Sequence, residues 1–361
     1  ISNDSLSLLA AKFPQEEVFK NVNTSRKANV TETIPVTPGS FNVALLLPFE
    51  SAQKNQFIYE IYSGMKLAVD SLAKIGVNIN MVPYETGKDS AKILEFLNTK
   101  DINNFDLFIG PVYSAQQKWV GEFADKEGIA LVNPISNFNG LPNNPKYFSY
   151  PPTYETQGKK AAEFALNNFT RRRNAVIVHG RSFGDSIIAY AYKAEFERLG
   201  GKVLLLKRLS AGTANYFGTV LSKIPIDSMG HIFVSSLEPS IGANLFSYLE
   251  GVLLEKAKTY RESMVPGEKK ERKLSPADIP ILVPQEWLNF QNINYEQFVL
   301  HNTHFICPQF VDQDEIPNNS FIDNYFKTTG LTPTTFAFSG YQMMLYYGMA
   351  LSKYGKKIWK Y

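Results

Sequence analysis

The chain has 361 residues, which is too long for one ordinary domain and suits two. Its content of 44% hydrophobic and 20% charged residues is ordinary for a soluble globular protein, and the net charge of +3 is not gathered into a nucleic-acid-binding stripe. No apolar run approaches the roughly 18 residues that span a bilayer, and the single cysteine, Cys307, excludes an intrachain disulfide.

Residues 1–40 differ from the rest, because they end in a polar linker rich in Thr and Pro that we expect to tether the globular part to something upstream. From Phe41 onward, apolar strand patterns alternate with amphipathic helix patterns, which predicts an α/β fold with a parallel, doubly wound sheet. The expected strands are Phe41–Phe49, Val77–Tyr84, Asp106–Ile109 and Ile129–Val132, and the expected helices are Ile58–Ile75, Ser90–Leu97 and Ser114–Lys126.

The alternation restarts at Tyr147 and predicts a second sheet of the same kind. The expected helices are Thr156–Phe169, Asp185–Leu199, Tyr216–Ile224 and Ile241–Lys256, and the expected strands are Ala175–His179, Val203–Leu209, His231–Ser235 and Ile279–Val283. The charged segment Ala257–Asp278 is expected to be a surface excursion.

The end of the chain is expected to return to the first lobe through a strand at Thr303–Phe310, followed by helices at Phe321–Thr328 and Phe336–Tyr354. The predicted domains are a tail (1–40), lobe 1 (41–148, with 300–361 returning to it) and lobe 2 (149–299). This is the two-lobe Venus-flytrap architecture, and the motion it supports is hinge closure around a ligand.

Polar residues follow two neighbouring predicted strands of the first lobe. Ser114 follows the Gly110-Pro111 turn, and Ser136 and Asn137 follow the Asn133-Pro134 turn. Ligands of parallel α/β sheets lie outside the carboxyl ends of the strands. These loops therefore offer hydroxyl, amide and backbone N–H groups to one point in space.

The segment Asp106–Asn137 resembles type I periplasmic binding proteins, the branched-chain amino acid receptor family of ABC transporters, in its IGP-x-x-S turn and its following P-x-S turn. Further matching stretches are YSGMKLAVDSLAKIGVNI, IVHGRSFGDS and VSSLEPSIG. The opening FNVALLLPF and the late GYQMMLYYGMALSKYG are most similar to a subgroup found downstream of LysM repeats in envelope proteins.

The resemblance implies a set of ligand-binding residues. In the first lobe these are Ser114, the N–H of Ala115, Ser136 and Asn137, and in the second lobe Tyr154, Phe183, Leu237 or Glu238, and Gln285 or Glu286. Asn137 replaces a usual Thr, Phe183 replaces a common Tyr and Tyr154 replaces an acid, so recognition of an ammonium group is left open.

Simpler interpretations stand beside these roles. Ser114 is equally well interpreted as a helix cap, Ser136 and Asn137 as ordinary turn residues, and Phe183 as a residue that closes the hydrophobic edge of a lobe. Glu286, next to Trp287, is the favoured carboxylate because it follows a strand end. The pair His301 and His304 lacks the partners of a zinc site, so no metal and no cofactor are expected.

Signals for catalysis are weak. The S-x-x-K matches at Ser51–Lys54 and Ser71–Lys74 lack a following K-T-G, and no G-x-S-x-G or phosphate-binding loop occurs. We therefore expect a non-enzymatic protein. The resemblance implies a location in the periplasm, or anchored to the envelope, a small polar ligand such as an amino acid, peptide or cell-wall fragment, and an ABC permease as a candidate partner. The alternative is an envelope protein that contacts peptidoglycan or a peptidoglycan synthase.

Overall fold

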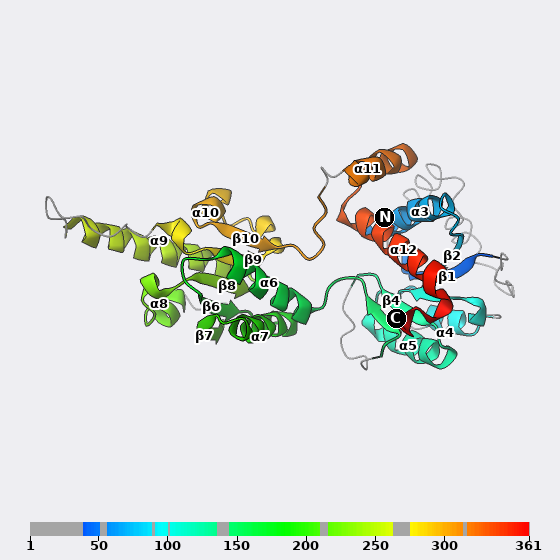
Figure 1. Cartoon of the computed structure of the whole chain (residues 1–361), viewed down its shortest axis with the longest axis horizontal. Helices are drawn as coiled ribbons and strands as arrows, with labels where there is room; N and C mark the ends of the chain where they lie inside the picture. The colour runs from blue at the N-terminus through cyan, green and yellow to red at the C-terminus, as the bar shows by residue number, and fades with distance from the viewer. Residues whose placement is uncertain are drawn as a thin grey trace. The chain divides into compact units, whose positions relative to one another are not determined.

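The computed structural model describes residues 39–50, 56–88, 91–99, 102–135, 144–209, 216–262, 275–312 and 316–360 (Figure 1). The chain divides into two compact units, one from Ile1–Pro151 together with Gln309–Tyr361 and the other from Pro152–Pro308. Each unit holds a five-stranded parallel sheet flanked by helices, which confirms the predicted α/β class. The predicted N-terminal linker lies outside the described residues.

The first unit is organised around β1 (Phe41–Leu47), whose unbroken apolar run is buried on both faces of the sheet. The strand order is β2-β1-β3-β4-β5, and all the pairings are parallel. The other strands are β2 (Ile79–Glu85), β3 (Leu107–Ile109), β4 (Ala130–Asn133) and β5 (Tyr147–Ser149). The sequence did not predict β5, because its residues are only half-buried at the edge of the sheet and lack the fully apolar run of the equally short β3.

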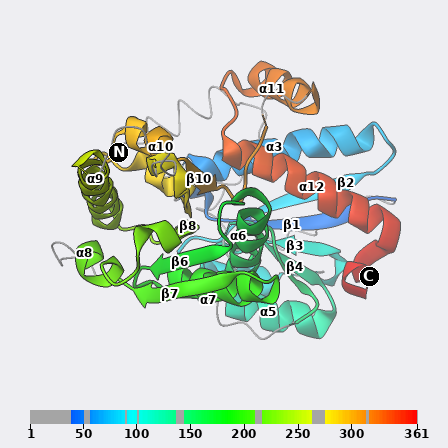
Figure 2. The same cartoon turned by 60° about the vertical axis from the view of Figure 1, so that its left-hand side comes forward.

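Helices cover both faces of this first sheet (Figure 2). On one face lie α3 (Phe57–Ala73) and α12 (Thr335–Tyr354), and on the other α4 (Ala91–Leu97) and α5 (Ser114–Glu127). The helix α11 (Ile316–Thr329) packs against α12, and short 3-10 turns lie at Ile102–Asn104 and Gly355–Lys360. A Cβ on Gly340 would meet the carbonyl of Ile61, so the backbones of α3 and α12 approach closely only because glycine stands there.

The second unit holds the sheet β10-β9-β8-β6-β7, again with parallel pairings. Its strands are β6 (Asn174–His179), β7 (Lys202–Arg208), β8 (His231–Ser235), β9 (Ile281–Pro284) and β10 (Thr303–Ile306). The expectation that the strand starting at Thr303 returns to the first lobe is wrong, since β10 pairs with β9. The unpredicted helix α10 (Tyr295–Leu300) explains the error, because it makes β9, α10 and β10 one βαβ unit.

Helices also cover both faces of the second sheet. On one face lie α6 (Tyr154–Asn168) and α7 (Phe183–Arg198). On the other lie α8 (Tyr216–Leu221), α9 (Pro239–Glu262) and α10, with 3-10 turns at Ile226–Ser228, Pro276–Asp278 and Gln285–Asn289. The helix α9 continues six residues beyond the predicted Lys256, and residues 263–274 of the charged segment lie outside the described part. Among the described residues, no helix has the length and apolar character needed to cross a bilayer.

The two strand orders locate the crevices where ligands of such sheets are expected. The order reverses between β1 and β3 in the first unit and between β6 and β8 in the second. Connections leave a sheet in opposite directions at such a switch point, so a crevice opens outside the carboxyl ends of the two strands. The loops that follow β1, β3, β6 and β8 are therefore the places to look for a site.

Candidate functional site

Ser114 and Ala115 are the first two residues of α5 and directly follow the loop after β3. Tyr113 occupies the N-cap position with extended backbone, and no side chain caps the helix. Both Ser114 and Ala115 are exposed. The capping interpretation of Ser114 is therefore wrong, and its hydroxyl faces solvent at the positive end of the helix.

Buried amide side chains hold this first turn of α5 in place. Gln116 donates from Nε2 to the carbonyl of Thr86 at 3.0 Å, which fixes α5 to the loop after β2. Gln117 donates to the carbonyl of Val112 at 3.3 Å. Gly110 has a φ of +91°, and a Cβ there would collide with the carbonyl of Leu46. The loop after β3 is thus anchored from two sides, which preorganises the backbone at Ser114.

Glu85, at the carboxyl end of β2, is a further polar group that the sequence did not single out. One carboxylate oxygen accepts the N–H of Glu50 at 2.6 Å and the other accepts the N–H of Gly87 at 2.5 Å. Burial raises the pKa of Glu85 despite these two donors and the nearby Lys92. Glu85 therefore ties the loop after β1 to the loop after β2.

The remaining first-lobe residues, Ser136 and Asn137, lie outside the described residues. The strand before them, β4, ends at the buried Asn133, whose side-chain oxygen accepts the N–H of Ile135 at 3.0 Å. This hydrogen bond forms an Asx turn at the predicted place. The roles of Ser136 and Asn137 stay predictions.

In the second unit, the loop after β6 leads into α7 through Ser182. The hydroxyl of Ser182 accepts the N–H of Asp185 at 3.0 Å, and the Asp185 carboxylate accepts the N–H of Ser182 at 3.3 Å. This capping box fixes the start of the helix. Phe183 follows with 70% of its surface exposed, and the half-buried ring of Tyr154 lies against Gly184. The structure therefore brings Tyr154 next to the turn that carries Phe183.

The loop after β8 carries Leu237 and Glu238. The N–H of Glu238 donates to the hydroxyl of Ser236 at 3.2 Å, and the indole N–H of the fully buried Trp287 donates to the carbonyl of Ser236 at 2.8 Å. Leu237 projects outward and is 53% exposed. Trp287 thus stabilises the loop through this hydrogen bond from the core.

Two polar atoms of this loop are sealed from solvent without satisfying a hydrogen bond. Within the described part of the chain, neither Oε2 of Glu238 nor the hydroxyl of Ser235 finds a partner. A buried carboxylate oxygen without a donor costs about 1–3 kcal/mol or more. Ser235, the last residue of β8, was missed by sequence reasoning because a serine at a strand end has no distinctive pattern.

Gln285 and Glu286 follow β9 as the first residues of the 3-10 turn Gln285–Asn289. Gln285 is half-buried, whereas Glu286 is exposed. Burial, and then the charge of Glu286, raise the pKa of the Cys307 thiol, which places this carboxylate near the segment that follows β10. Glu286 is therefore a solvated charge, whereas the half-buried Glu238 has one carboxylate oxygen, Oε2, sealed from solvent.

The loops after β6 and β8 meet at the switch point of the second sheet. A Cβ on Gly180, directly after β6, would lie 2.7 Å from the hydroxyl of Ser236, so the two loops touch there. Trp287 joins the loop after β9 to the same group. Among the described residues, no three His, Cys, Asp or Glu side chains are grouped to hold a metal ion. The arrangement offers hydrogen bonds and charge.

Known proteins resemble this chain in fold. A protein of Rhodospirillum rubrum, proposed as a branched-chain amino acid ABC transporter, superposes with a TM-score of 0.63 at 16% identity, over 89% of this chain and 88% of that one. An ABC transporter substrate-binding protein of Desulfitobacterium hafniense in complex with Leu gives 0.55 at 15% identity, over 89% and 88%. No curated protein matches the sequence.

The sequence also matches a family model over residues 40–224, which is more than half of the chain. The matched range covers the first sheet and the loops after β1, β3 and β6, and it ends in the second unit beyond α8. The chain belongs to the periplasmic binding protein family.

Proposed function

We propose that this chain is a non-catalytic, extracytoplasmic binding protein for a small polar ligand that carries a hydrogen-bond donor, such as an amino acid, a short peptide or a cell-wall fragment. The family is extracytoplasmic, and its members bind substrates for ABC transporters rather than convert them. The observation that supports the proposal most is that the Ser235 hydroxyl and Oε2 of Glu238, which end or follow β8 near the switch point, are buried without a hydrogen-bond partner among the described residues.

The chemistry of the Glu238 carboxylate limits the class of ligand that it can bind. A carboxylate oxygen accepts and cannot donate, so Glu238 calls for an ammonium, amide or hydroxyl group. A charge-assisted hydrogen bond to an ammonium group is about twice as strong as one between neutral groups. The substrate-binding protein of Desulfitobacterium hafniense holds Leu, a ligand with an ammonium group, and that likeness favours the same class here.

In the first unit, the exposed residues Ser114 and Ala115 at the start of α5 suit a carboxylate group of a ligand. The N-terminus of α5 attracts negative charge, so a carboxylate would be held there by N–H groups that no side chain caps. We propose the roles of Tyr154, Phe183, Leu237 and Gln285 as contacts to the remaining ligand surface.

A second candidate function keeps the fold without a transported ligand. Phe183 and Leu237 are 70% and 53% exposed at the same edge of the second sheet. Exposed apolar side chains that lie close together mark protein interaction sites in some soluble proteins. This observation favours an envelope protein that contacts peptidoglycan or a peptidoglycan synthase.

Thermal stability against a ligand panel distinguishes the two functions. The protein is unfolded and refolded to remove bound ligand, then melted with amino acids, short peptides and muropeptides. A ligand at 100 times its Kd adds about 2.7 kcal/mol of stability. We expect a shift with one chemical class, and its loss in Glu238→Gln.

Glu286→Gln provides the matched variant, since it removes an exposed carboxylate from the neighbouring loop. We expect Glu238→Gln to weaken binding by about 2 kcal/mol or more, and Glu286→Gln to leave it nearly unchanged. If Glu286→Gln weakened binding and Glu238→Gln did not, the binding site would lie at the loop after β9 instead. No shift with any ligand would favour the interaction protein, and a pull-down from envelope extract would follow.

Hinge closure and an ABC permease partner, which the resemblance implies, stay predictions. Small-angle X-ray scattering of the full chain with and without the ligand found in the panel tests the closure. A decrease in the radius of gyration on binding is the expected result, and an unchanged scattering curve would argue against it.

A further inference from the structure

The amino edge of the second sheet contains a cavity of about 310 Å³. It is walled by the loops that precede β6, β8, β9 and β10, and its lining includes Phe169, Thr170, Arg171, Ala277, Asp278 and His304. The candidate residues of the second unit all follow strand ends at the opposite edge. The six residues of β6 separate the two edges by about 16 Å at roughly 3.3 Å per residue.

Arg171 is held rigidly at the wall of this cavity. Its Nε donates to the carbonyl of Asp278 at 2.9 Å, and its Nη2 donates to the carbonyl of Met229. These carbonyls belong to two different loops, so the guanidinium plane is fixed before any ligand arrives. Within the described part of the chain, no hydrogen bond engages Nη1. A preorganised guanidinium with a free N–H edge suits carboxylate and phosphate oxygens.

The one carboxylate in the lining belongs to Asp278, and its negative charge acts on Arg171 together with that of Asp227. Oδ2 of Asp278 accepts the N–H of Ser275 at 2.7 Å and its hydroxyl at 3.0 Å, as part of the cap of a 3-10 turn. Asp278 is therefore occupied by its own turn, and it meets Arg171 through its backbone carbonyl. Arg172, which is exposed next to Arg171, adds further positive charge.

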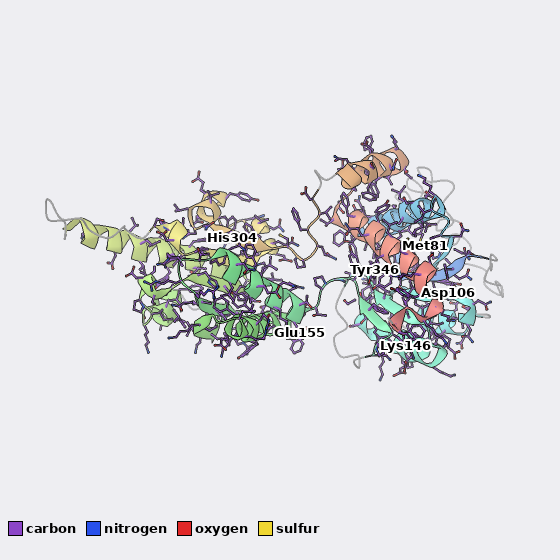
Figure 3. The ribbon with its side chains drawn as sticks, in the orientation of Figure 1. Met81, Asp106, Lys146, Glu155, His304 and Tyr346 are labelled. Atoms are coloured by element: carbon purple, nitrogen blue, oxygen red, sulfur yellow. The ribbon has the colours of Figure 1, made fainter. Side chains whose placement is uncertain are left out.

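The wall at β10 is polar but uncharged. The ring of His304, labelled in Figure 3, lies 5.0 Å from the ring of Phe169 and 5.4 Å from that of Phe164, measured between centroids. Burial lowers the pKa of His304, so at neutral pH its imidazole is a neutral hydrogen-bonding group. A ligand in the cavity therefore meets the Arg171 cation, the Asp278 carboxylate held in its own turn, one neutral imidazole and one aromatic surface.

We propose that this cavity is a second ligand site, separate from the one at the carboxyl edge, which takes a small anion bearing carboxylate or phosphate oxygens. Its volume lies at the lower end of the range of about 300–1,000 Å³ for small-molecule sites, so it suits an anion of metabolite size rather than a polymer. Arg171 pairs with the anionic oxygens, and His304 and the Thr170 hydroxyl supply further hydrogen bonds.

Histidine NMR of the full-length protein tests the site with inorganic phosphate and succinate as probes. The ring signal of His304 is assigned from its disappearance in His304→Gln. We expect a saturable shift of this signal with at least one probe. His179 lies at the carboxyl end of β6 and serves as the internal control, because its signal should stay in place. Saturation with phosphate alone or succinate alone identifies the anion class.

Two variants remove the site by different means. Arg171→Gln should weaken binding about tenfold or more through loss of a charged hydrogen bond. Ala277→Trp, at an exposed lining position, should fill the cavity while leaving Arg171 in place. Arg173→Gln is the matched control, since it removes an exposed arginine of the same run that does not line the cavity, and it should leave binding unchanged.

Three results would overturn the proposal: no shift of His304 at millimolar phosphate or succinate, equal shifts of His304 and His179, or unaltered binding in both Arg171→Gln and Ala277→Trp. These results do not depend on the proposed function, because the residue tested there, Glu238, lies at the opposite edge of the sheet from the cavity. Binding of the probes should persist in Glu238→Gln.

Discussion

Two serines at helix starts allow a direct test of which one is a cap. Ser182 accepts the N–H of Asp185 at 3.0 Å within a capping box, whereas Ser114 lies one position inside α5 and caps nothing. Loss of a serine cap costs about 1 kcal/mol, within a range of about 0.5–2 kcal/mol. An exposed serine without such a contact can be replaced within about 0.5 kcal/mol. Ser182→Ala should therefore destabilise its unit, and Ser114→Ala should not.

The measurement must follow each unit by itself, because a chain of two units need not unfold in a single step. The three tryptophans make this possible. Trp287 is buried in the second unit, and Trp119 and Trp359 belong to the first. In a Trp119→Phe, Trp359→Phe background, urea unfolding followed by the fluorescence of Trp287 reports the second unit alone. The unmodified Trp119 and Trp359 in a Trp287→Phe background report the first.

A loss of about 1 kcal/mol corresponds to a decrease in Tm of roughly 2–4 °C for a body of about this size. A cost above about 1 kcal/mol for Ser114→Ala would show that its hydroxyl supports the fold, and its proposed role toward a ligand would lose its structural basis. No cost for Ser182→Ala would refute the importance of the capping box. We expect Ser114→Ala to keep the stability of the ligand-free protein and to reduce the increase in stability that a ligand causes.

Three further predictions concern the glycine turns and a buried histidine. Gly180→Ala should lower the stability of the second unit in urea, because the added Cβ would collide with the Ser236 hydroxyl and the Asp185 carboxylate. An unchanged urea midpoint would contradict this close approach. Gly110→Ala should destabilise the first unit by more than the usual penalty of about 1 kcal/mol for positive φ, because it also meets a carbonyl. Burial lowers the pKa of His231 to about 3 from its ordinary value of 6.5, so on acidification the imidazole is protonated in the unfolded chain before it is protonated in the folded one. The free energy of unfolding should therefore fall by about 1.4 kcal/mol per pH unit as the pH decreases below 6.5. A flat urea midpoint between pH 7 and pH 5 would refute that assignment.

Most elements of the fold could be predicted from the sequence, because long periodic segments carry a strong signal. The strand at His231–Ser235 has the predicted bounds, and α12 differs from its prediction by one residue at its start. The failures are short elements. β5 (YFS) is half-buried at a sheet edge and has no fully buried residue, and α10 buries only Phe298, so neither shows the apolar pattern by which the equally short β3 and α8 were recognised. Missing α10 then led directly to the wrong assignment of β10.

The sequence indicated which loops carry the candidate residues, but it did not reveal what each residue does there. Loops after parallel strands were expected to carry polar groups, and the switch points between β1 and β3 and between β6 and β8 agree with that expectation. Whether a serine caps a helix depends on the backbone angles of the residue before it, which sequence does not reveal. Ser182 was not proposed as a cap although it is one, and Ser114 was considered as a cap although Tyr113 takes that position.

The choice between the carboxylates Glu238 and Glu286 illustrates why burial must be known before a role is assigned. Both follow strands at the same edge of the sheet, and Glu286, next to Trp287, was favoured from sequence because of its place at a strand end. Trp287 instead turns inward and donates to the loop that carries Glu238. Within the described residues, Oε2 of Glu238 is sealed from solvent, while Glu286 is exposed. A hydrated carboxylate gains little from a new partner because it must first lose water, whereas a carboxylate oxygen that has already lost water gains nearly the whole hydrogen bond. The residue to which the tryptophan is adjacent in sequence is therefore the weaker candidate, and the residue that the tryptophan supports in space is the stronger one.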